Sequence, residues 1–292
     1  MGSIHTIHGI PMAHFELTPS HIRPIVQLAL EEDIGSGDVS AALIPAETRA
    51  EARVISREDA VICGRLWFDE VFQQLSHEVE IEWLVDEGAQ VKPDQPIVQL
   101  HGPARALLSG ERTALNFLQT LSGTATVTRR YVEALGDSKT RLLDTRKTLP
   151  GLRLAQKYAV RCGGGHNHRL GLHDMIMLKE NHIAAAGGIQ AAVQRARAQF
   201  PDLKVEVETE TLQEVDAALQ AGADIIMLDN FDIPTVCEAL ERIKGRALTE
   251  LSGNVTLDTL PQLAKLGVDF ISTGAITKHV RAIDLSMRIV NE

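Results

Sequence analysis

The sequence is poor in aromatic residues, in cysteine, in long apolar runs and in net positive charge. Aromatic residues make up 4% of the 292 residues, and 39 acidic residues against 29 basic ones leave a net charge of −10. Binding to nucleic acid depends mainly on Lys and Arg neutralising phosphates, so an acidic, aromatic-poor chain is a poor candidate for it. No apolar run reaches the roughly 18 residues that a transmembrane helix needs, so we expect no membrane span.

Cysteine is also scarce. Cys63, Cys162 and Cys237 are far apart and odd in number, which argues against a disulfide framework and favours a reducing cytoplasm. An apolar content of 44% is ample for a core, and the length suits one large barrel or two domains. We therefore expect a cytoplasmic globular protein.

Positive charge is concentrated in the middle of the chain. Between Arg141 and His182 there are eight basic and three acidic residues, a net charge of +5, so the rest of the chain carries −15. A run of charge is usually a solvated helix face. Because these charges stand among apolar runs and glycines, we favour an anion-binding site instead.

The first residues do not look like folded structure. The segment MGSIHTIHGIP precedes a second methionine, Met12, and we expect residues 1–17 to be an added leader or a disordered tail. Gly2 and Thr6 formally fit a myristoylation pattern, but that pattern is short and common.

Residues 18–135 are expected to form a small α+β unit. Apolar spacing predicts a helix from His21 to Glu32, and period-two alternation between about Ala50 and Pro103 predicts strands around a helical WFDEVFQQL stretch. A long helical pattern over 106–135, interrupted near Gly123, is expected to bridge two domains.

Residues 136–292 alternate short apolar runs with amphipathic helices, such as those predicted from Leu212 to Ala221 and from Thr259 to Leu266. Roughly six such units predict a parallel sheet with right-handed crossovers, and they favour a β/α barrel, possibly incomplete, over an open doubly wound sheet. The sequence contains a weak internal repeat. GAD precedes the strand-like segment IIMLDN in residues 222–230, and the similar GVD precedes FISTGA in residues 267–275. The chain's last helix is expected to return to the N-terminal domain.

Polar residues follow the predicted strands, where barrel enzymes place their chemistry. The candidates are Thr145, Arg146, Lys147, Lys179, Glu208, Thr209, Asp229, Asn230, Ser252, Gly253, Asn254, Thr273, Gly274 and Ala275. Each alone could be only a helix cap, but six strand ends together indicate a site.

The residue types at these ends describe a polyanionic ligand. Arg146, Lys147, Arg169 and Lys179 suit carboxylates and phosphates, and the SGN and TGA turns offer backbone amides at helix N-termini. Glu208 and Asp229 are hard oxygen ligands of the kind that hold Mg²⁺.

The same residues allow other interpretations of the site's function. Cys162, His166 and His168 could bind zinc, although CGGGHNHR lacks the paired spacing of structural zinc motifs. Lys147 or Lys179 could form a Schiff base, as in a barrel lyase acting on a phosphorylated sugar. A non-catalytic phosphate or nucleotide sensor is a further alternative.

Five segments together resemble the quinolinate phosphoribosyltransferases. They are DTRKTLPGLR, CGGGHNHRLGLHDMIMLKENH, VEVET, IMLDNF and SGN, and the likeness extends over essentially the whole chain from about Ser20. Leu251 and Thr273 depart from the family pattern, and neither departure touches a charged position.

The resemblance implies a fold and an activity. The implied fold is an N-terminal α/β sandwich followed by an incomplete β/α barrel. The implied reaction transfers the phosphoribosyl group of phosphoribosyl pyrophosphate to the ring nitrogen of quinolinate, with decarboxylation, and uses Mg²⁺. It gives nicotinate mononucleotide, pyrophosphate and CO₂ in NAD synthesis. Relatives that act on nicotinate remain an alternative.

The resemblance also implies a homodimer and residue roles. Arg112, which from the sequence alone would be a surface residue paired with Glu111, would reach the neighbouring subunit's site. It would clamp the quinolinate carboxylates together with Arg146, His168, Arg169 and Lys179. Lys147 would face the pyrophosphate, Glu208 and Asp229 would hold the ribose and the metal, and residues 252–254 and 273–275 would hold the 5-phosphate. Lys147, Glu208 and Asp229 are the implied catalytic residues.

Overall fold

A computed structural model describes residues 15–290 of the chain. The residues divide into two compact units. A sandwich unit contains Phe15–Arg129, Leu149–Gly164 and the chain from His279 onward, and a barrel unit contains Arg130–Thr148 and Gly165–Lys278. The myristoylation pattern and most of the predicted leader lie outside the described residues.

The sandwich unit is built on a four-stranded antiparallel sheet in the order β12-β1-β5-β3. The strands are β12 (Leu285–Val290), β1 (Arg49–Ser56), β5 (Pro96–Pro103) and β3 (Glu80–Trp83), with a separate ribbon of β2 (Ala60–Val61) and β4 (Gln90–Val91). The helices are α1 (Pro19–Ile34), α2 (Arg65–Leu75), α3 (Ala104–Ala134) and α4 (Arg153–Cys162), and a short 3₁₀ turn, η1, covers Ala41–Leu43.

Period-two alternation positions this sheet on its core. Ala52, Val54 and Ser56 of β1 are buried, whereas the neighbouring Glu51 and Arg53 are exposed, as the sequence predicts. The buried side chains pack against apolar residues of α1, α2 and α3, including Trp67 and Phe68. The polar residues of the strands lie on the other face of the sheet.

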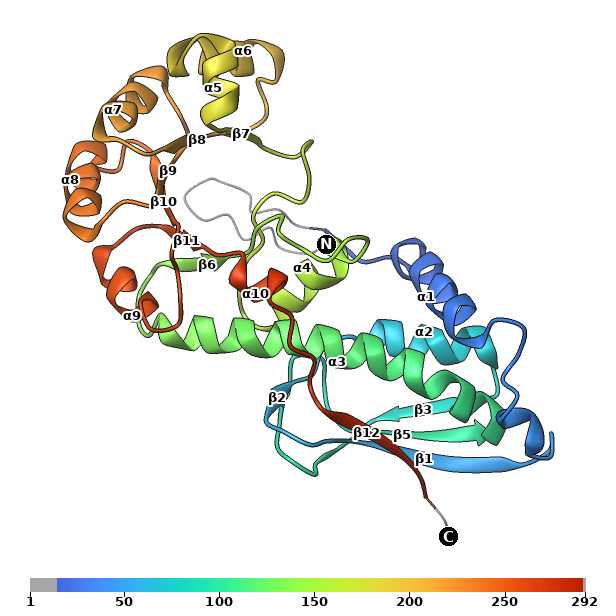
Figure 1. The fold of residues 1–292 in the computed structure, drawn as a ribbon. Coiled ribbons are helices and arrows are strands. Elements are labelled where there is room, and N and C mark those ends of the chain that lie inside the picture. The colour runs from blue at the N-terminus through green and yellow to red at the C-terminus, as the bar shows by residue number, and fades with distance from the viewer. Residues whose placement is uncertain (1–14, 291–292) are drawn as a thin grey trace. The chain divides into compact units, whose positions relative to one another are not determined.

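The barrel unit contains a six-stranded parallel sheet in the order β6-β11-β10-β9-β8-β7. Its strands are β6 (Arg141–Leu143), β7 (Ile176–Leu178), β8 (Val205–Thr209), β9 (Ile225–Asp229), β10 (Leu248–Ser252) and β11 (Phe270–Ser272). Its helices are α5 (Glu180–Ala186), α6 (Ile189–Gln199), α7 (Leu212–Ala221), α8 (Ile233–Ile243), α9 (Leu260–Leu263), η2 (Ala264–Leu266) and α10 (Ala275–Lys278). Figure 1 shows the helices outside the curved sheet, which is open between its edge strands β6 and β7. The two units are therefore the expected incomplete β/α barrel and α/β sandwich.

The weak GAD and GVD repeat has a structural cause. Asp224 precedes β9, and its Oδ2 accepts a hydrogen bond of 2.8 Å from the amide of Val205, where β8 begins. Asp269 precedes β11, and its Oδ2 accepts one of 2.8 Å from the amide of Thr249 in β10. Each aspartate thus ties the start of its own strand to the neighbouring strand, which sets the relative positions of the carboxyl ends.

Three segment assignments differ from the sequence predictions. Phe15 and Leu17, placed in the leader, are part of the fold: the Arg161 guanidinium lies 4.4 Å from the Phe15 ring centroid, and Leu17 packs against the core. Residues 149–164 and the chain from His279 onward belong to the sandwich unit, not to the barrel. The last described element is the strand β12 rather than a helix, because its apolar residues pair with β1 and help to close the sandwich core.

The long helix is also continuous through Gly123, where an interruption was predicted. A Cβ at Gly123 would lie 2.1 Å from the carbonyl oxygen of Arg281. The glycine therefore allows the C-terminal chain to approach the helix, where the amide of Ile283 donates to the carbonyl of Gln119 at 3.0 Å. It serves packing and does not break the helix.

Candidate active site

A polar cavity of about 360 Å³ lies at the carboxyl ends of the barrel strands. Its lining residues are Thr145, Arg146, Lys147, His168, Arg169, Met177, Lys179, Glu208, Met227, Asp229, Glu250, Ser252 and Ser272. Nine of these were candidates from the sequence, and the structure brings them together from segments more than 100 residues apart. Strand order explains this, because parallel strands present their carboxyl ends at one edge.

The other predicted residues do not line this cavity. Gly253 and Asn254 follow β10 with positive φ angles of 92° and 51°, and a Cβ at Gly253 would lie 2.1 Å from Oδ1 of Asn230. Thr273, Gly274 and Ala275 form the turn before α10, where Thr273 Oγ1 accepts a hydrogen bond of 3.2 Å from the Ala275 amide. Arg112 lies on α3 with a side chain 57% exposed, and its nearest acid is Glu111 at 3.9 Å.

Two arginines give the cavity its anion-binding character. Arg146 has a buried Nε that makes no hydrogen bond among residues 15–290. Arg169 is 8% exposed, and burial together with repulsion from Arg146 lowers the pKa of its guanidinium. Two guanidinium groups held close in a partly buried setting are stabilised by a bound anion.

Two lysines complete the basic lining. Lys179 forms an ion pair with Glu208 across the cavity. The main chain of Lys147 is fixed by Thr277, whose Oγ1 donates a hydrogen bond of 2.8 Å to the Lys147 carbonyl. A Cβ at Gly274 would lie 2.8 Å from Lys147 Cδ, so this glycine lets the lysine side chain cross the turn.

The predicted +5 segment does not act as one patch. Only Arg146, Lys147, Arg169 and Lys179 of its eight basic residues line the cavity. Arg153, Lys157 and Arg161 belong to α4 in the sandwich unit, and Lys157 is fully buried. Sequence proximity overstated the patch because the chain leaves the barrel between β6 and β7.

A buried aspartate joins two of the site segments. Asp144 is 0% exposed and accepts hydrogen bonds from the His168 amide at 2.8 Å and from Asn167 Nδ2 at 2.7 Å. The amide of His166 also donates to the Leu142 carbonyl at 2.9 Å, and Leu143 and His166 form a parallel bridge. Residues 166–169 therefore run beside β6, which places Arg169 near Arg146.

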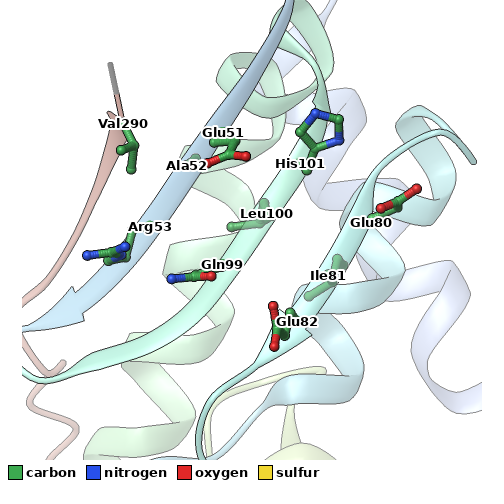
Figure 2. A pocket seen from close by; sticks show the side chains of 10 residues that line it. All are labelled: Glu51, Ala52, Arg53, Glu80, Ile81, Glu82, Gln99, Leu100, His101 and Val290. Atoms are coloured by element: carbon green, nitrogen blue, oxygen red, sulfur yellow. The ribbon is translucent and has the colours of Figure 1, made fainter. Parts of the chain in front are cut away.

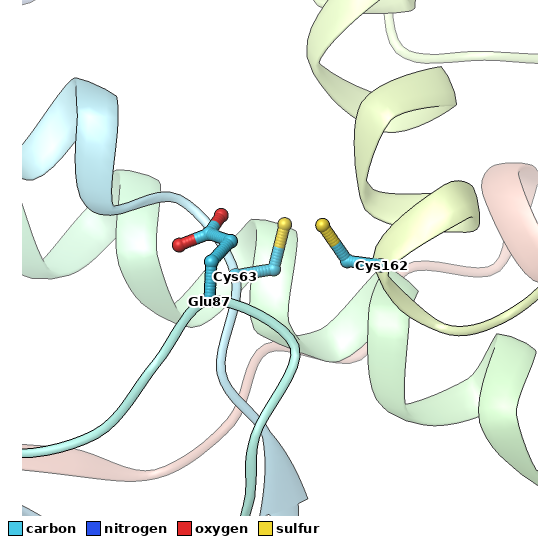
Figure 3. A group of neighbouring side chains, drawn as sticks. All are labelled: Cys63, Glu87 and Cys162. Atoms are coloured by element: carbon cyan, nitrogen blue, oxygen red, sulfur yellow. The ribbon is translucent and has the colours of Figure 1, made fainter. Parts of the chain in front are cut away.

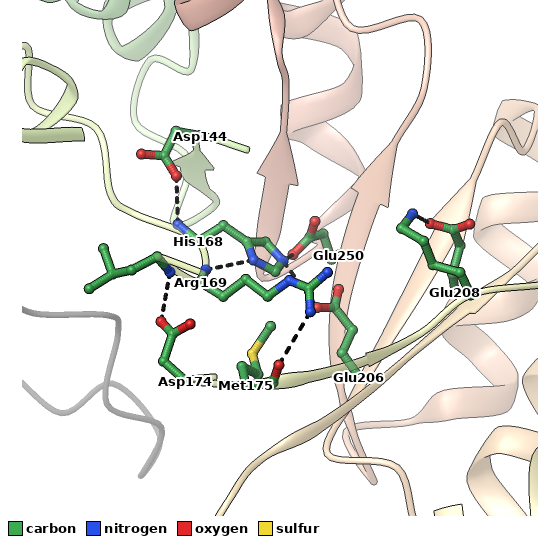
Figure 4. Close-up of polar contacts among 10 residues, drawn as sticks. Asp144, His168, Arg169, Asp174, Met175, Glu206, Glu208 and Glu250 are labelled. Atoms are coloured by element: carbon green, nitrogen blue, oxygen red, sulfur yellow. Dashed lines mark hydrogen bonds and ion pairs between the residues drawn. The ribbon is translucent and has the colours of Figure 1, made fainter. Parts of the chain in front are cut away.

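A second buried group lies at the base of the cavity (Figure 4). Nε2 of His168 is 3.0 Å from Oε2 of Glu206 and 3.4 Å from Oε2 of Glu250, and both glutamates are 0% exposed. Burial, and after it the charge of Glu250, raises the pKa of Glu206 to about 7. Burial lowers the pKa of His168, but the carboxylates of Glu250 and Glu206 outweigh this and raise it.

Sequence reasoning did not identify Glu206 and Glu250. The available signal was the placement of each acid in the interior of a predicted strand, VEVET or LTELS. Glu206 also alternates in period two with Glu208, so the two side chains leave the same face of β8. A glutamate in the middle of a central strand is rarely buried without a partner, which makes it a candidate for a site.

Another hollow of similar size lies on the polar face of the sandwich sheet. Figure 2 shows its lining residues, among which are Glu51, Arg53, Glu80, Glu82 and His101. Three glutamates against one arginine give this surface the wrong charge for a polyanion. Its chemistry therefore does not match the ligand class that the basic residues predict.

The zinc alternative finds no support in the described residues. Cys162 groups with Cys63 and Glu87 in the sandwich unit (Figure 3), whereas His168 groups with Glu206 and Glu250 in the barrel. Burial raises the pKa of the Cys63 thiol, and the two Glu87 oxygens accept the amides of Gly64 and Arg65 at 2.8 and 3.3 Å. A protonated thiol and a carboxylate already satisfied by amides indicate a structural contact.

None of the helices within residues 15–290 is both long enough and apolar enough to cross a membrane.

Both units of this chain match models of one protein family. The quinolinate phosphoribosyl transferase N-terminal domain matches residues 38–122, and the corresponding C-terminal domain matches residues 124–288. A probable nicotinate-nucleotide pyrophosphorylase (carboxylating) of Bacillus subtilis is 44% identical over 88% of this chain and 90% of its own length. The same-named protein of Synechocystis is 45% identical over 92% of each chain.

Solved structures agree with the sequence matches. The nicotinate-nucleotide pyrophosphorylase from Francisella tularensis superimposes with a TM-score of 0.92 at 46% identity, covering 94% of this chain and 98% of that one. The likeness therefore spans both units and the segments that carry the cavity.

Proposed function

Because the chain belongs to the quinolinate phosphoribosyltransferase family, we propose that it transfers the phosphoribosyl group of phosphoribosyl pyrophosphate to quinolinate, with decarboxylation. The products are nicotinate mononucleotide, pyrophosphate and CO₂. The observation that carries the proposal is the pair of adjacent guanidinium groups of Arg146, which is half-buried, and Arg169, which is buried, in a cavity that is also lined by Glu208 and Asp229. The location we propose is the cytoplasm.

The basic residues account for recognition of quinolinate. Quinolinate carries two neighbouring carboxylates, and planar guanidinium groups bind such oxygens in pairs. Arg146, Arg169 and Lys179 surround one cavity, so they can neutralise the dianion and exclude water from its ring. His168 lies in the same lining.

The remaining lining residues account for recognition of phosphoribosyl pyrophosphate. Lys147 is exposed at the rim and would attract the pyrophosphate, while Ser252 and the turns at 252–254 and 273–275 would hold the 5-phosphate through backbone amides. Glu208 and Asp229 would accept hydrogen bonds from the ribose hydroxyls.

The two acids also fit a divalent cation. Glu208 and Asp229 both line the cavity, and each is a hard oxygen donor of the kind that Mg²⁺ prefers beside substrate phosphates. When bound, Mg²⁺ would supply positive charge that neutralises the pyrophosphate. Lys179 already pairs with Glu208, so this lysine and the cation would share one carboxylate.

The reaction needs no side-chain nucleophile. The quinolinate nitrogen forms a bond to C1 of the ribose as the bond from C1 to pyrophosphate breaks. Glu208 and Asp229 stabilise the positive charge that develops on the ribose, and Lys147 stabilises the leaving group. The quaternised ring then accepts the electron pair of the C2–carboxylate bond; CO₂ leaves and C2 takes up a proton. Orientation by the arginines supplies much of the acceleration.

The decisive test mixes the protein with quinolinate, phosphoribosyl pyrophosphate and Mg²⁺ and measures CO₂ and pyrophosphate together. We expect equimolar release that depends on both substrates. Nicotinate in place of quinolinate serves as the control for the related transferases, and turnover with nicotinate alone would overturn the proposal. Borohydride trapping tests the lyase alternative, because only a Schiff base would add covalent mass to the chain.

We further propose a homodimer in which Arg112 completes the partner subunit's site. The exposure of its side chain and its weak pairing with Glu111 leave the guanidinium available for such a contact. An inactive Arg112→Ala chain mixed with an inactive Lys179→Ala chain should form hybrids in which one of the two sites is intact.

Random exchange should restore about a quarter of the wild-type activity, because half of the dimers are hybrids with one working site. Activity of the mixture is compared with that of each variant alone, and subunit exchange is followed by mass-labelled chains. Complete exchange without recovered activity would contradict the shared site.

A further inference from the structure

Both nitrogens of the His168 imidazole face groups inside the protein, one through a hydrogen bond and the other at ion-pair distance. Nδ1 accepts a hydrogen bond of 2.7 Å from the main-chain amide of Arg169. Nε2 is buried and lies within 3.4 Å of the carboxylates of Glu206 and Glu250. Figure 4 shows the ring between these partners. Neither nitrogen is left to face a ligand in the cavity.

The amide of Arg169 assigns the tautomer. The glutamates raise the pKa of His168 and so favour a second ring proton, but the Arg169 N–H that points at Nδ1 from 2.7 Å leaves no room for a proton there. The ring proton is therefore on Nε2 and faces the two glutamates. The three side chains offer atoms within 4.8 Å of one another, a spacing that a metal ion could use. Coordination through Nε2 would require a proton on Nδ1 and would break the contact with Arg169. The group is therefore better explained as a support than as a metal site.

We propose that His168, Glu206 and Glu250 are positioning residues that act on the dicarboxylate substrate through Arg169. The glutamates hold the imidazole, the imidazole fixes the main chain of Arg169, and Arg169 meets the substrate. The inference rests on the proposed function, since it takes quinolinate as the ligand. It departs from the family expectation that His168 itself binds a substrate carboxylate.

The geometry supports an indirect role. The amide of His168 donates to the buried Asp144, and the amide of Arg169 donates to the ring, so two consecutive residues have their main chain fixed. The carboxylate of Glu206 also interacts electrostatically with the Arg169 guanidinium. A displacement of about 1 Å in a substrate clamp can cost on the order of 100-fold in rate. Loss of the support should thus weaken quinolinate binding specifically.

Replacing His168 by asparagine or by glutamine tests the roles of its two ring nitrogens separately. Asparagine places its amide oxygen where Nδ1 lies and keeps the acceptor for Arg169, whereas glutamine reaches the position of Nε2 and loses that acceptor. Both changes are made in a Glu206→Gln background, where the new amide can donate to Glu250 and replaces the lost Nε2 proton. The background alone is the matched control.

We expect His168→Gln with Glu206→Gln to raise the Kd for quinolinate about tenfold or more over the background. His168→Asn with Glu206→Gln should stay within about threefold of it. Calorimetric titration measures the Kd, and the affinity for phosphoribosyl pyrophosphate should change in neither variant. Equal effects, or the reverse order, would overturn the inference, and the reverse order would assign His168 to direct substrate contact.

The wild-type chain supplies a test that depends on no variant. In long-range ¹H–¹⁵N spectra of protein labelled in histidine, the most slowly exchanging ring proton should be on Nε2, with an unprotonated Nδ1, before and after quinolinate is added. A proton on Nδ1, or a change at Nε2 on binding, would contradict the inference. Failure of wild-type protein to bind quinolinate would instead contradict the proposed function.

Discussion

Replacing Arg146 by alanine is expected to lower quinolinate affinity by on the order of 100- to 1,000-fold while the protein stays folded. The guanidinium lines the cavity, and its buried Nε has no hydrogen-bond partner within residues 15–290. The side chain thus contributes little to the fold and is available to the ligand. Titration of quinolinate measures the binding loss, and thermal unfolding measures stability.

Arg195→Ala is the matched control, because Arg195 is an exposed arginine on α6 outside the cavity. It should leave quinolinate affinity unchanged. Arg169→Ala should resemble Arg146→Ala in binding, with some loss of stability because the side chain is buried beside Glu206. Normal quinolinate affinity in either site variant would refute the assignment of that residue.

Replacing Gly123 by alanine is expected to lower stability by about 3 kcal/mol, the upper end of what overpacking usually costs. The added methyl would lie 2.1 Å from the Arg281 carbonyl oxygen, so helix α3 and the returning chain would have to separate. A backbone neighbour cannot rotate away as a side chain can. For a unit of this size the unfolding midpoint should fall by roughly 6 to 12 °C.

Asn116→Ala provides the comparison in the same helix, since Asn116 is exposed. Its effect should remain within about 0.5 kcal/mol of wild type. Calorimetry of both variants gives the two midpoints. If Gly123→Ala unfolded at the wild-type temperature, the close approach between helix and returning chain would be refuted.

Local sequence patterns predicted the barrel elements well. The helix predicted at Leu212–Ala221 is α7 with the same bounds, because Thr211 and Glu214 form a capping box and Gly222 ends it with a φ of 79°. Such signals lie within one turn of the helix they define. The helix predicted through 259–266 instead divides into α9 and a 3₁₀ turn.

The candidate site was predictable where a polar or charged residue lies at the carboxyl end of a strand or just after it. Thr145, Arg146, Lys147, Lys179, Glu208, Asp229 and Ser252 all satisfy that rule, and all line the cavity. The rule fails for Glu250, which reaches the cavity from inside β10. It also cannot assign Arg112, whose proposed partner is a second chain.

By itself, the sequence determined most of the barrel elements, the net negative charge and the residue types that suit a dicarboxylate and a pyrophosphate. Only the tertiary structure decided that residues 149–164 of the +5 segment leave the barrel unit, that β12 returns to the first sheet, and that His168 meets Glu206 and Glu250. Capping and periodicity act over a few residues and can be read along the chain. Contacts between β8, β10 and residues 166–169 depend on strand order and burial, which no local pattern encodes.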